Sequence, residues 1–213
     1  MVLYSKLDER KTVRLGSHWA YNYLNDPKRL SFVLSRYRLA AQMSSRARSV
    51  LELGCSDGIG ATTLKQGRNS YLGIDLDKKA IQHAIDSLSH QDGFDFIYND
   101  FMGKEYGSFD AVVSLDVIEH IHKEHEAEYL STIWKNCHDQ GVVIIGTPNI
   151  TAAQYASAES NLGHVNLFSQ QRLCDSLSAF FHSVFPFGMN DELPHCGYAN
   201  MSHYIFAIGC NKK

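Results

Sequence analysis

The chain has 213 residues, of which 44% are hydrophobic and 20% are charged, and this composition excludes a disordered or collagen-like protein. Its 20 lysines and arginines stand against 23 aspartates and glutamates, a balance that argues against a general nucleic-acid-binding protein. No run approaches the roughly 20 apolar residues of a membrane span, and the beginning of the chain lacks the apolar run of a secretory signal.

The five cysteines are odd in number and include no Cys-x-x-Cys pair, so neither a disulfide framework nor a zinc ribbon is indicated. We therefore expect a reducing compartment, the cytoplasm. The length corresponds to one domain with a short appendage.

Residues 1–48 are predicted to form an amino-terminal arm that leads into a helix. Residues 17–25 are rich in aromatic side chains, and Asp26 followed by Pro27 is typical of a helix N-cap and the first helical residue. Along residues 28–43 the apolar side chains recur on one helical face. This pattern predicts a helix with one buried side.

Residues 49–213 are predicted to form one compact α/β unit, because short apolar runs alternate there with helical stretches. Such alternation is typical of a doubly wound, mainly parallel sheet with helices on both faces, in other words a Rossmann-like fold. The last two runs have no helix between them, so we expect them to pair antiparallel at one edge. Seven strands are expected, at residues 49–54, 70–75, 94–98, 109–116, 141–147, 180–187 and 202–209. The expected helices are at residues 58–66, 77–89, 122–138 and 169–179.

The first predicted strand runs into a glycine-containing loop, residues 52–58, which reads ELGCSDG. In a doubly wound sheet, the carboxyl end of the first strand is where a nucleotide-like ligand binds. Gly54 and Gly58 would let the backbone turn tightly and approach a ligand closely. An ordinary strand–helix turn can carry the same residues, so the loop alone does not decide between the two interpretations.

The next two predicted strands also end in acidic residues. Asp75 ends the second strand, where a carboxylate can accept hydrogen bonds from both hydroxyls of a ribose. Asp100 follows the third strand and is placed to accept a hydrogen bond from an adenine amino group, with Phe101 covering the ring. Three neighbouring strands with polar ends at one sheet edge favour a ligand site over unrelated turns.

These segments, together with FDAVVSLDVIEHI at residues 109–121, resemble the motif series of class I S-adenosylmethionine-dependent methyltransferases. The resemblance covers residues 49–147 well and residues 160–213 more loosely, and Ser56 replaces the middle glycine of the first motif. It implies S-adenosylmethionine as cofactor and S-adenosylhomocysteine as product, with Gly54 against the methionine part. The cofactor-binding residues that it implies are Glu52, Gly54, Ser56, Gly58, Asp75, Leu76, Asp100, Phe101, Leu115 and Asp116, the last two beside the sulfonium.

A nicotinamide-dependent enzyme is the main alternative for this loop. Its fingerprint requires a glycine two residues after the first, where this chain has Ser56. Asp57 would also repel a pyrophosphate, whereas the acidic groups Glu52, Asp57 and Asp116 suit a cationic cofactor. The loop therefore favours the methyltransferase interpretation.

Two histidines are candidates for the acceptor side of the site. His164 lies in GHVNLFS, which resembles the segment of small-molecule O-methyltransferases in which a histidine faces the substrate, and it is the leading general base. Glu119 and His120 resemble a pair that shapes the active site in many members, so His120 is the second candidate. A purely structural histidine is the alternative in both cases. His122 and His125 lack the spacing of an HExxH motif, and no metal site is predicted.

The expected reaction is methylation of a small hydroxylated acceptor, such as a sugar or another metabolite. The chain lacks the Asn-Pro-Pro-Tyr and Asp-Pro-Pro-Tyr motifs of amino-group methylases, the Pro-Cys nucleophile of cytosine methylation, and an added RNA-binding domain. Because the resemblance implies that the amino-terminal segment covers the cofactor, residues 1–48 are predicted to supply a lid. A non-catalytic cofactor-binding subunit of a biosynthetic complex, and aminopropyl transfer on the same fold, are the alternatives.

Overall fold

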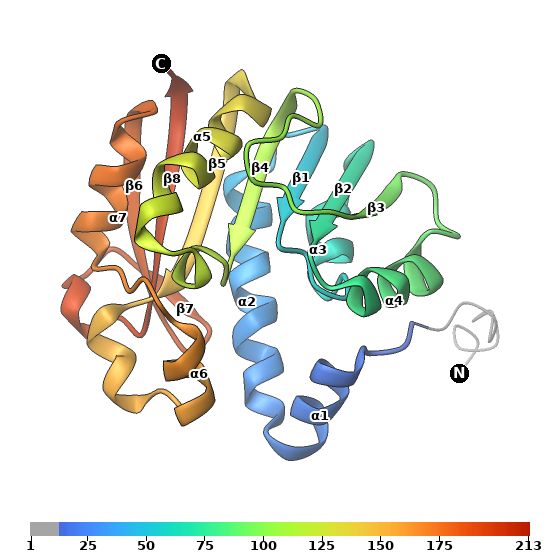
Figure 1. Ribbon diagram of the computed structural model, residues 1–213, viewed down its shortest axis with the longest axis horizontal. Helices are drawn as coiled ribbons and strands as arrows, with labels where there is room; N and C mark the ends of the chain where they lie inside the picture. The colour runs from blue at the N-terminus through green and yellow to red at the C-terminus, as the bar shows by residue number, and fades with distance from the viewer. Residues whose placement is uncertain (1–12) are drawn as a thin grey trace, which may run out of the picture.

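A computed structural model describes residues 13–213, apart from the side chains of residues 159 and 160. One eight-stranded mixed sheet crosses the molecule in the order β3-β2-β1-β4-β5-β8-β6-β7 (Figure 1). The expected α/β architecture, with helices on both faces of a largely parallel sheet, is confirmed. Of the predicted amino-terminal arm, residues 1–12 lie outside the described part of the chain.

Five consecutive strands are parallel, and their carboxyl ends share one edge of the sheet. Their interiors are apolar runs because both faces are covered, as parallel sheets require. In Figure 1 the carboxyl ends of β1, β2 and β4 point toward the side where α1 and α6 lie. The five strands are β1 (Ser49–Leu53), β2 (Ser70–Asp75), β3 (Phe94–Tyr98), β4 (Phe109–Leu115) and β5 (Cys137–Pro148).

The remaining strands are antiparallel, as expected for two runs without an intervening helix. β8 (Tyr204–Lys212) lies between β5 and β6 (Phe181–Asn190) and pairs antiparallel with both. The sheet has eight strands instead of the predicted seven, because Leu193–His195 forms a short additional strand, β7, against the end of β6. A three-residue edge strand with a proline carries too little periodic signal to be recognised in the sequence.

The four expected helices between the strands are present but shorter, and a further short helix forms at Ala158–Gly163, where none was expected. The predicted helix 122–138 is replaced by a short 3-10 turn and α5 (Glu126–Asn136), because the chain enters β5 at Cys137. None of the described helices is long and apolar enough to cross a membrane. The other helices are α1 (Ser17–Asn25), α2 (Pro27–Met43), α3 (Ala61–Lys65), α4 (Lys78–Leu88), α6 (Ala158–Gly163) and α7 (Gln170–Ser178).

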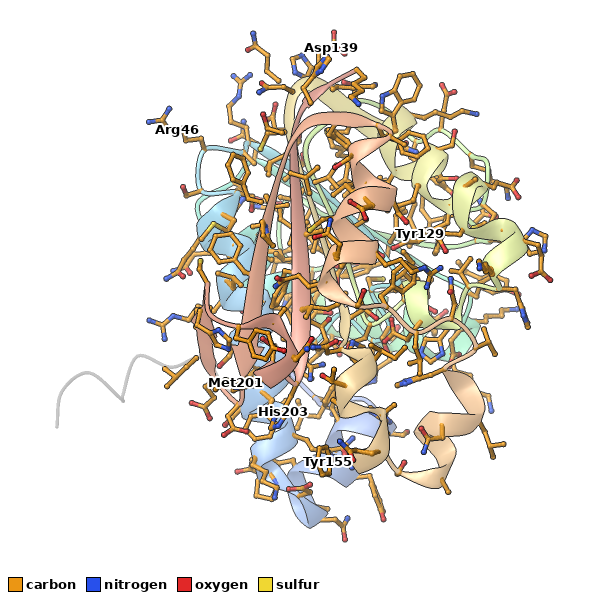
Figure 2. The ribbon with its side chains drawn as sticks, turned by 90° about the vertical axis from the view of Figure 1, so that its left-hand side faces the viewer. Arg46, Tyr129, Asp139, Tyr155, Met201 and His203 are labelled. Carbon is orange, nitrogen blue, oxygen red and sulfur yellow. The ribbon has the colours of Figure 1, made fainter. Side chains whose placement is uncertain are left out.

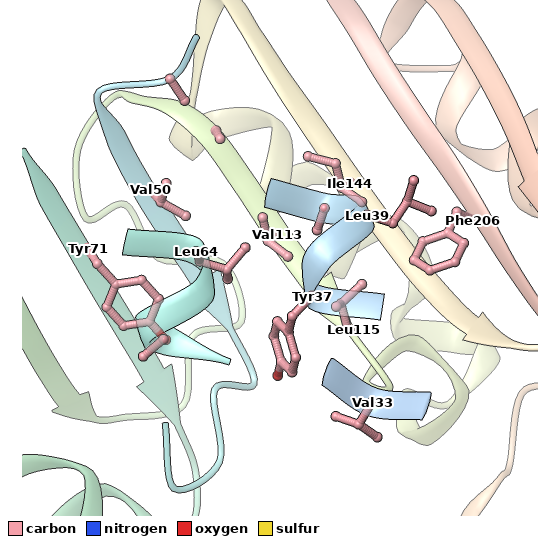
Figure 3. Close-up of a cluster of buried hydrophobic side chains, with 14 of the residues drawn as sticks. Val33, Tyr37, Leu39, Val50, Leu64, Tyr71, Val113, Leu115, Ile144 and Phe206 are labelled. Atoms are coloured by element: carbon pink, nitrogen blue, oxygen red, sulfur yellow. The ribbon is translucent and has the colours of Figure 1, made fainter. Parts of the chain in front are cut away.

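Alternating strand residues divide the core between the two faces of the sheet. On one face, Val113 and Ile144 pack with Tyr37 and Leu39 of α2, and α3 and α4 complete that layer (Figure 3). On the other face α5 and α7 cover the sheet, with Ile133 and Leu173 among their buried residues. Thus α2, which follows α1 directly, is a core helix. Its predicted role as part of a lid stays a prediction.

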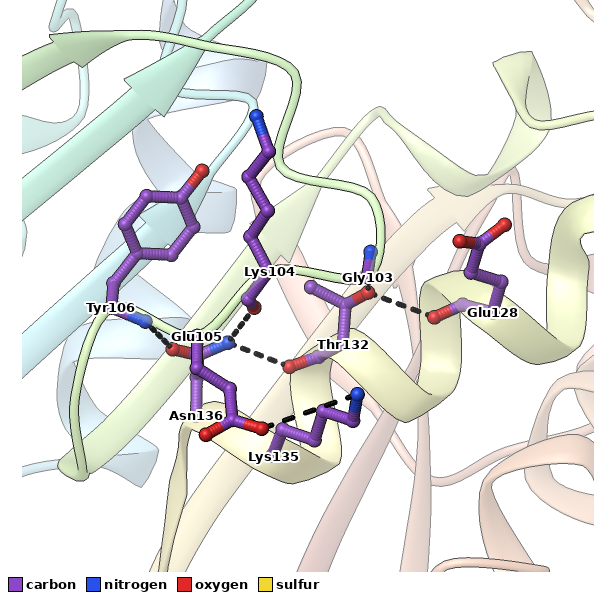
Figure 4. A network of polar contacts seen from close by, with 8 residues as sticks. All are labelled: Gly103, Lys104, Glu105, Tyr106, Glu128, Thr132, Lys135 and Asn136. Atoms are coloured by element: carbon purple, nitrogen blue, oxygen red, sulfur yellow. Dashed lines mark hydrogen bonds and ion pairs between the residues drawn. The ribbon is translucent and has the colours of Figure 1, made fainter.

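The loop between β3 and β4 is fastened to α5 by side-chain hydrogen bonds (Figure 4). The Asn136 amide accepts a hydrogen bond from the Tyr106 N–H (2.6 Å) and donates one to the Lys104 carbonyl (2.8 Å). The Thr132 hydroxyl accepts a hydrogen bond from the Gly103 N–H (2.8 Å). These bonds satisfy loop backbone groups that would otherwise need water, and they fix the segment that follows the carboxyl end of β3.

Asp77 caps α4, as its position before a helical run indicates. Its carboxylate accepts hydrogen bonds from the N–H groups of Lys79 (2.8 Å) and Ala80 (3.2 Å). Asp77→Ala should therefore lower the free energy of unfolding by about 1 kcal/mol, whereas Asp77→Ser should cost only a few tenths of that. Urea denaturation of the three proteins measures this difference, and equal stability of the two variants would contradict the cap.

Candidate functional site

The loop after β1 is held against the end of β2. The N–H groups of Gly54 and Cys55 both donate to the Ile74 carbonyl, at 2.8 and 3.2 Å. Gly54 has a φ of +84°, a left-handed conformation that glycine adopts without strain. A Cβ at Gly54 would lie 2.2 Å from a methyl group of Val117, so the space there admits backbone only. The loop therefore presents bare backbone at the edge of the sheet.

Asp75 holds this loop and keeps hydrogen-bonding capacity for a ligand. Its two oxygens accept hydrogen bonds from the N–H groups of Ser56 (2.7 Å) and Asp77 (2.8 Å). Because each carboxylate oxygen can accept about two hydrogen bonds, both can still receive a ligand hydroxyl. Leu76, directly after it, is 60% exposed and offers an apolar surface. A vicinal diol joined to a flat ring fits this pair of side chains.

Asp100 and Phe101 take different positions from each other. Asp100 is exposed where β3 ends, and its carboxylate accepts a hydrogen bond from the Met102 N–H (3.0 Å). The Phe101 ring is only 4% exposed and packs 6.3 Å from the Tyr129 ring in the core. The expectation that Phe101 covers an adenine ring is therefore wrong for this conformation, because its side chain contributes to the core instead.

Glu52 lies beneath the glycine loop rather than at its surface, so its expected contact with the cofactor is corrected to a supporting position. The side chain is fully buried, and the Tyr71 hydroxyl donates a hydrogen bond to Oε2. Burial, reinforced by the charges of Asp75 and Asp57, raises the pKa of Glu52 to about 7 despite the hydrogen bond from Tyr71. A buried carboxyl group that keeps its proton near neutral pH thus supports the loop from beneath.

Asp57 lies at the other end of the same loop. Its Oδ1 atom is buried and has no hydrogen-bond partner in the described part of the chain. Burial raises the pKa of Asp57, and the charge of nearby His83 partly offsets this. Gly16 passes so close that a Cβ there would lie 1.9 Å from Asp57 Oδ2. The segment before α1 therefore crosses the glycine loop, and a donor or cationic group would satisfy the orphaned oxygen.

The residues that follow β4 carry an ion pair that sequence reasoning missed. Asp116 has a φ of +57°, unusual for a residue other than glycine, and its two oxygens accept hydrogen bonds from Arg36 Nη1 at 2.9 Å each. The guanidinium of Arg36, from α2, also lies 3.9 Å from the centre of the Tyr204 ring. Arg36 therefore neutralises the carboxylate that was expected to lie beside the sulfonium. Leu115, directly before it, is 3% exposed and belongs to the core.

A chamber of about 720 Å³ opens beside Asp116, between α1, α2 and the segments that follow β4 and β5. Glu119, His120 and His164 lie on its wall. Glu119 is 1% exposed and accepts a hydrogen bond from the Thr147 hydroxyl (2.9 Å). Burial and the charge of Asp116 raise the pKa of Glu119. The structure thus brings both predicted histidines to one cavity.

The two histidines lie edge to face, with ring centres 5.2 Å apart. His120 Nδ1 is 2.8 Å from the Gly163 carbonyl oxygen, which can only accept, so this nitrogen carries the proton. Burial and the neighbouring His120 lower the pKa of His164, so its ring favours the neutral form. His122 and His125 are exposed at the 3-10 turn that follows.

A second pocket of about 510 Å³ continues from the chamber. The two cavities share Pro148, Tyr155, Ala156 and His164, and the second is walled mainly by alanines, Leu167 and aromatic rings. Figure 2 shows Tyr155, His203 and Met201 together at this end of the molecule, whereas Arg46 and Asp139 mark the opposite end. The larger hollow of about 850 Å³ near Arg46 lies at the amino ends of the strands, away from the glycine loop. The site is therefore assigned to the carboxyl edge.

The arrangement suits a ligand with a diol, a flat ring and a positive charge. The diol would meet Asp75, the ring would rest near Leu76, and the orphaned oxygen of Asp57 would accept from an ammonium group. These are the chemical parts of S-adenosylmethionine, so the residues present fit that cofactor. A pyrophosphate would instead meet the Asp57 carboxylate.

Comparison with known proteins agrees with this geometry. A family model described as a methyltransferase domain matches residues 25–180. The ubiquinone biosynthesis O-methyltransferase of Caulobacter vibrioides is 26% identical over 151 residues, which make up 66% of this chain and 59% of that protein. The chain therefore spans little more than half the length of this curated relative.

Two solved structures show the same fold at low sequence identity. The N-methyltransferase NodS from Bradyrhizobium japonicum WM9, in complex with S-adenosyl-L-homocysteine, superposes with a TM-score of 0.68 at 15% identity, covering 92% of this chain and 93% of that one. A TehB-like methyltransferase from Corynebacterium glutamicum superposes with a TM-score of 0.65 at 20% identity, covering 92% and 100%. At this identity the likeness concerns the fold alone.

The position of Glu52 predicts a pH-dependent stability. In the unfolded chain the carboxyl group loses its proton near pH 4.5, whereas in the folded protein it keeps the proton up to about pH 7. Stability present below pH 4.5 is therefore lost as the pH rises through this window. Glu52→Gln, which cannot ionise, should gain about 3 kcal/mol relative to the native chain between pH 4.5 and 7. Urea denaturation at several pH values measures this gain, and a constant difference would contradict it.

Proposed function

The chain belongs to the methyltransferase-domain family of S-adenosylmethionine-dependent enzymes, and we propose that it methylates a hydroxyl oxygen of a small molecule. The observation that carries the proposal is the meeting of His120, His164 and Glu119 on the wall of the chamber that also borders Asp116. A cofactor site alone would serve a binding subunit equally well. The imidazole of His164, whose lowered pKa favours the neutral form, faces this cavity and supplies what transfer to a hydroxyl requires, namely removal of its proton.

The carboxyl edge is proposed to hold the cofactor, which supplies a methyl group already activated on a sulfonium. Asp75 would accept hydrogen bonds from both ribose hydroxyls, Leu76 would support the adenine ring, and Asp100 would accept a hydrogen bond from the adenine amino group. Gly54 and Gly58 would bring backbone against the methionine part, with Ser56 keeping the loop on Asp75. The Arg36–Asp116 pair borders the place where the methyl group would enter the chamber.

His164 is proposed to activate the acceptor hydroxyl, with His120 as its neighbour. The ring of His164 is half-buried on the chamber wall and tends to be neutral, so its free nitrogen can act on a hydroxyl at neutral pH. His120 is fixed through the Gly163 carbonyl and is therefore better suited to orient than to move. Correct placement of the hydroxyl against the methyl group would supply most of the remaining acceleration.

The shape of the two cavities supports an acceptor with an apolar body more than a saccharide. The pocket beyond His164 has walls of Ala152, Ala153 and Leu167, which offer few partners for the many hydroxyls of a sugar. Toward α2 the chamber is lined by Lys28 and Arg29, so a polar or anionic end would lie there. We therefore favour a hydroxylated metabolite with an aromatic or aliphatic part.

The cysteines support a reducing compartment, and we propose the cytoplasm. All five are unpaired, and two of them, Cys55 and Cys137, are buried within the domain. Burial raises the pKa of the Cys55 thiol well above its usual range, which keeps it protonated and unreactive. Such cysteines are typical of proteins that fold without disulfide formation.

Asp75→Ala should weaken binding of S-adenosylhomocysteine by about 1.5–3 kcal/mol, or roughly 10- to 150-fold in dissociation constant, because it removes charged hydrogen-bond acceptors. Calorimetric titration measures the affinity. Asp95→Ala is the matched control, since Asp95 is an exposed carboxylate on β3 whose removal should leave the affinity unchanged. Equal affinity of the Asp75 variant and the native chain would remove Asp75 from the cofactor site.

His164→Ala should leave the affinity for S-adenosylhomocysteine intact and reduce turnover by roughly 10²–10⁴-fold, because the acceptor hydroxyl is no longer activated. His164→Gln should be nearly as slow, since an amide can form hydrogen bonds but cannot accept the proton. Methyl transfer to a panel of hydroxylated aromatic and aliphatic metabolites measures turnover. His182→Ala, which removes an exposed histidine of β6, is the control. Normal turnover in both His164 variants would place activation elsewhere.

A further inference from the structure

Three side chains that can ligate a metal converge on the chamber wall. One ligand atom from each of Glu119, His120 and His164 lies within 4.8 Å of the others. Metal–ligand bonds of about 2.0–2.2 Å place neighbouring ligand atoms roughly 3 Å apart, so modest side-chain rotation would complete the set. Two of the residues follow β4 and the third follows α6, so the cluster results from the fold and not from a local sequence motif.

Hydrogen bonds from neighbouring groups already orient two of the three potential ligands. Since the Gly163 carbonyl accepts a hydrogen bond from the N–H at His120 Nδ1, the Nε2 atom of that ring carries the lone pair that a cation needs. Metal-binding histidines are typically oriented in this way by a carbonyl or carboxylate on the other nitrogen. The Thr147 hydroxyl holds Oε2 of Glu119 in the same manner. Two of the three side chains are thus fixed by outer partners.

The carboxyl group of the cluster also lacks a close positive charge among the described residues. Glu119 is buried, yet no lysine or arginine nitrogen lies within 4.0 Å of its carboxylate in residues 13–213. The nearby Arg36 makes its two close contacts with Asp116 instead. Burying a carboxylate without a paired cation is unfavourable. Without a paired cation, burial raises the pKa of Glu119 and the carboxyl group keeps a proton, which a divalent cation would replace.

We infer that Glu119, His120 and His164 bind a divalent transition-metal cation that contacts the acceptor hydroxyl, an inference that rests on the proposed function. Two imidazole nitrogens and one carboxylate favour manganese, iron, cobalt, nickel or zinc over magnesium or calcium, which prefer oxygen ligands. Three protein ligands leave coordination positions open toward the chamber. The cation lowers the pKa of the acceptor hydroxyl, and the proton passes to water. In this form of the mechanism His164 activates the hydroxyl by holding the cation and does not accept the proton itself.

The test is titration of the EDTA-treated full chain with Co²⁺, followed by visible absorption, and with Zn²⁺, followed by calorimetry. One cation per chain should bind with a ligand-field band. Glu119→Gln, His120→Ala and His164→Ala should each weaken binding at least about tenfold. His122→Ala and His125→Ala remove exposed histidines of the adjacent turn and should leave binding unchanged. Because Glu119 is buried, His164→Ala, at a half-buried loop position, is the deciding variant.

Cofactor affinity separates this inference from the proposed function. If S-adenosylhomocysteine binds but Co²⁺ does not, or if Co²⁺ binds equally well to the native chain and to His164→Ala, the metal site is refuted and the proposed function stands. If the native chain fails to bind S-adenosylhomocysteine, the proposed function fails, whereas Co²⁺ binding is still judged by the variants.

Once an acceptor is found, EDTA should reduce turnover at least about tenfold and added cation should restore it. Undiminished turnover in EDTA would overturn the inference.

Discussion

The carboxylate of Asp75 sets the geometry on which the rest of the site depends. It accepts hydrogen bonds from the N–H groups of Ser56 and Asp77. It therefore fixes both the loop after β1 and the start of α4. The Ile74 carbonyl adds two more hydrogen bonds from the same loop. Parallel pairing brings β1 and β2 to a common edge, but only this contact turns the loop so that bare backbone faces a ligand. One residue thus shapes the site and remains able to bind within it.

Burial of charge is the second constraint, and the site resolves it differently at each carboxyl group. Glu52 keeps its proton beneath the loop and accepts a hydrogen bond from Tyr71. Asp116 is paired with Arg36, a fixed cation provided by a core helix. Glu119 has a hydroxyl partner but no close cation among the described residues. The carboxyl group of Glu52 is thus neutralised by a proton and that of Asp116 by an arginine, whereas Glu119, whose pKa burial also raises, keeps a proton that the proposed cation would replace.

The sequence predicts the features that depend on local pattern. The strand–helix alternation, the end of β2 at Asp75 and the Asp77 cap follow from periodicity and turn chemistry, and the structure agrees in each case. Cofactor binding by the glycine loop and Asp75 stays a prediction. Phe101 and Glu52 were misplaced because a sequence does not show on which side of a strand end a side chain lies. Arg36 could not be found at all, since its partner Asp116 is 80 residues away. The cluster around His120 and His164 is hidden for the same reason, although both residues were recognised singly.

The walls of the chamber come from chain segments that differ in how firmly they are held. On one side α2 is anchored by buried residues such as Tyr37, so Arg36 has a fixed position relative to the sheet. On the other side, the 3-10 segment Ile150–Tyr155 contributes no residue to either core cluster, yet it carries pocket residues and precedes His164. Because stability does not constrain this segment strongly, its side chains can vary without loss of the fold. Acceptor specificity would then reside between β5 and α7, whereas cofactor binding is tied to the sheet.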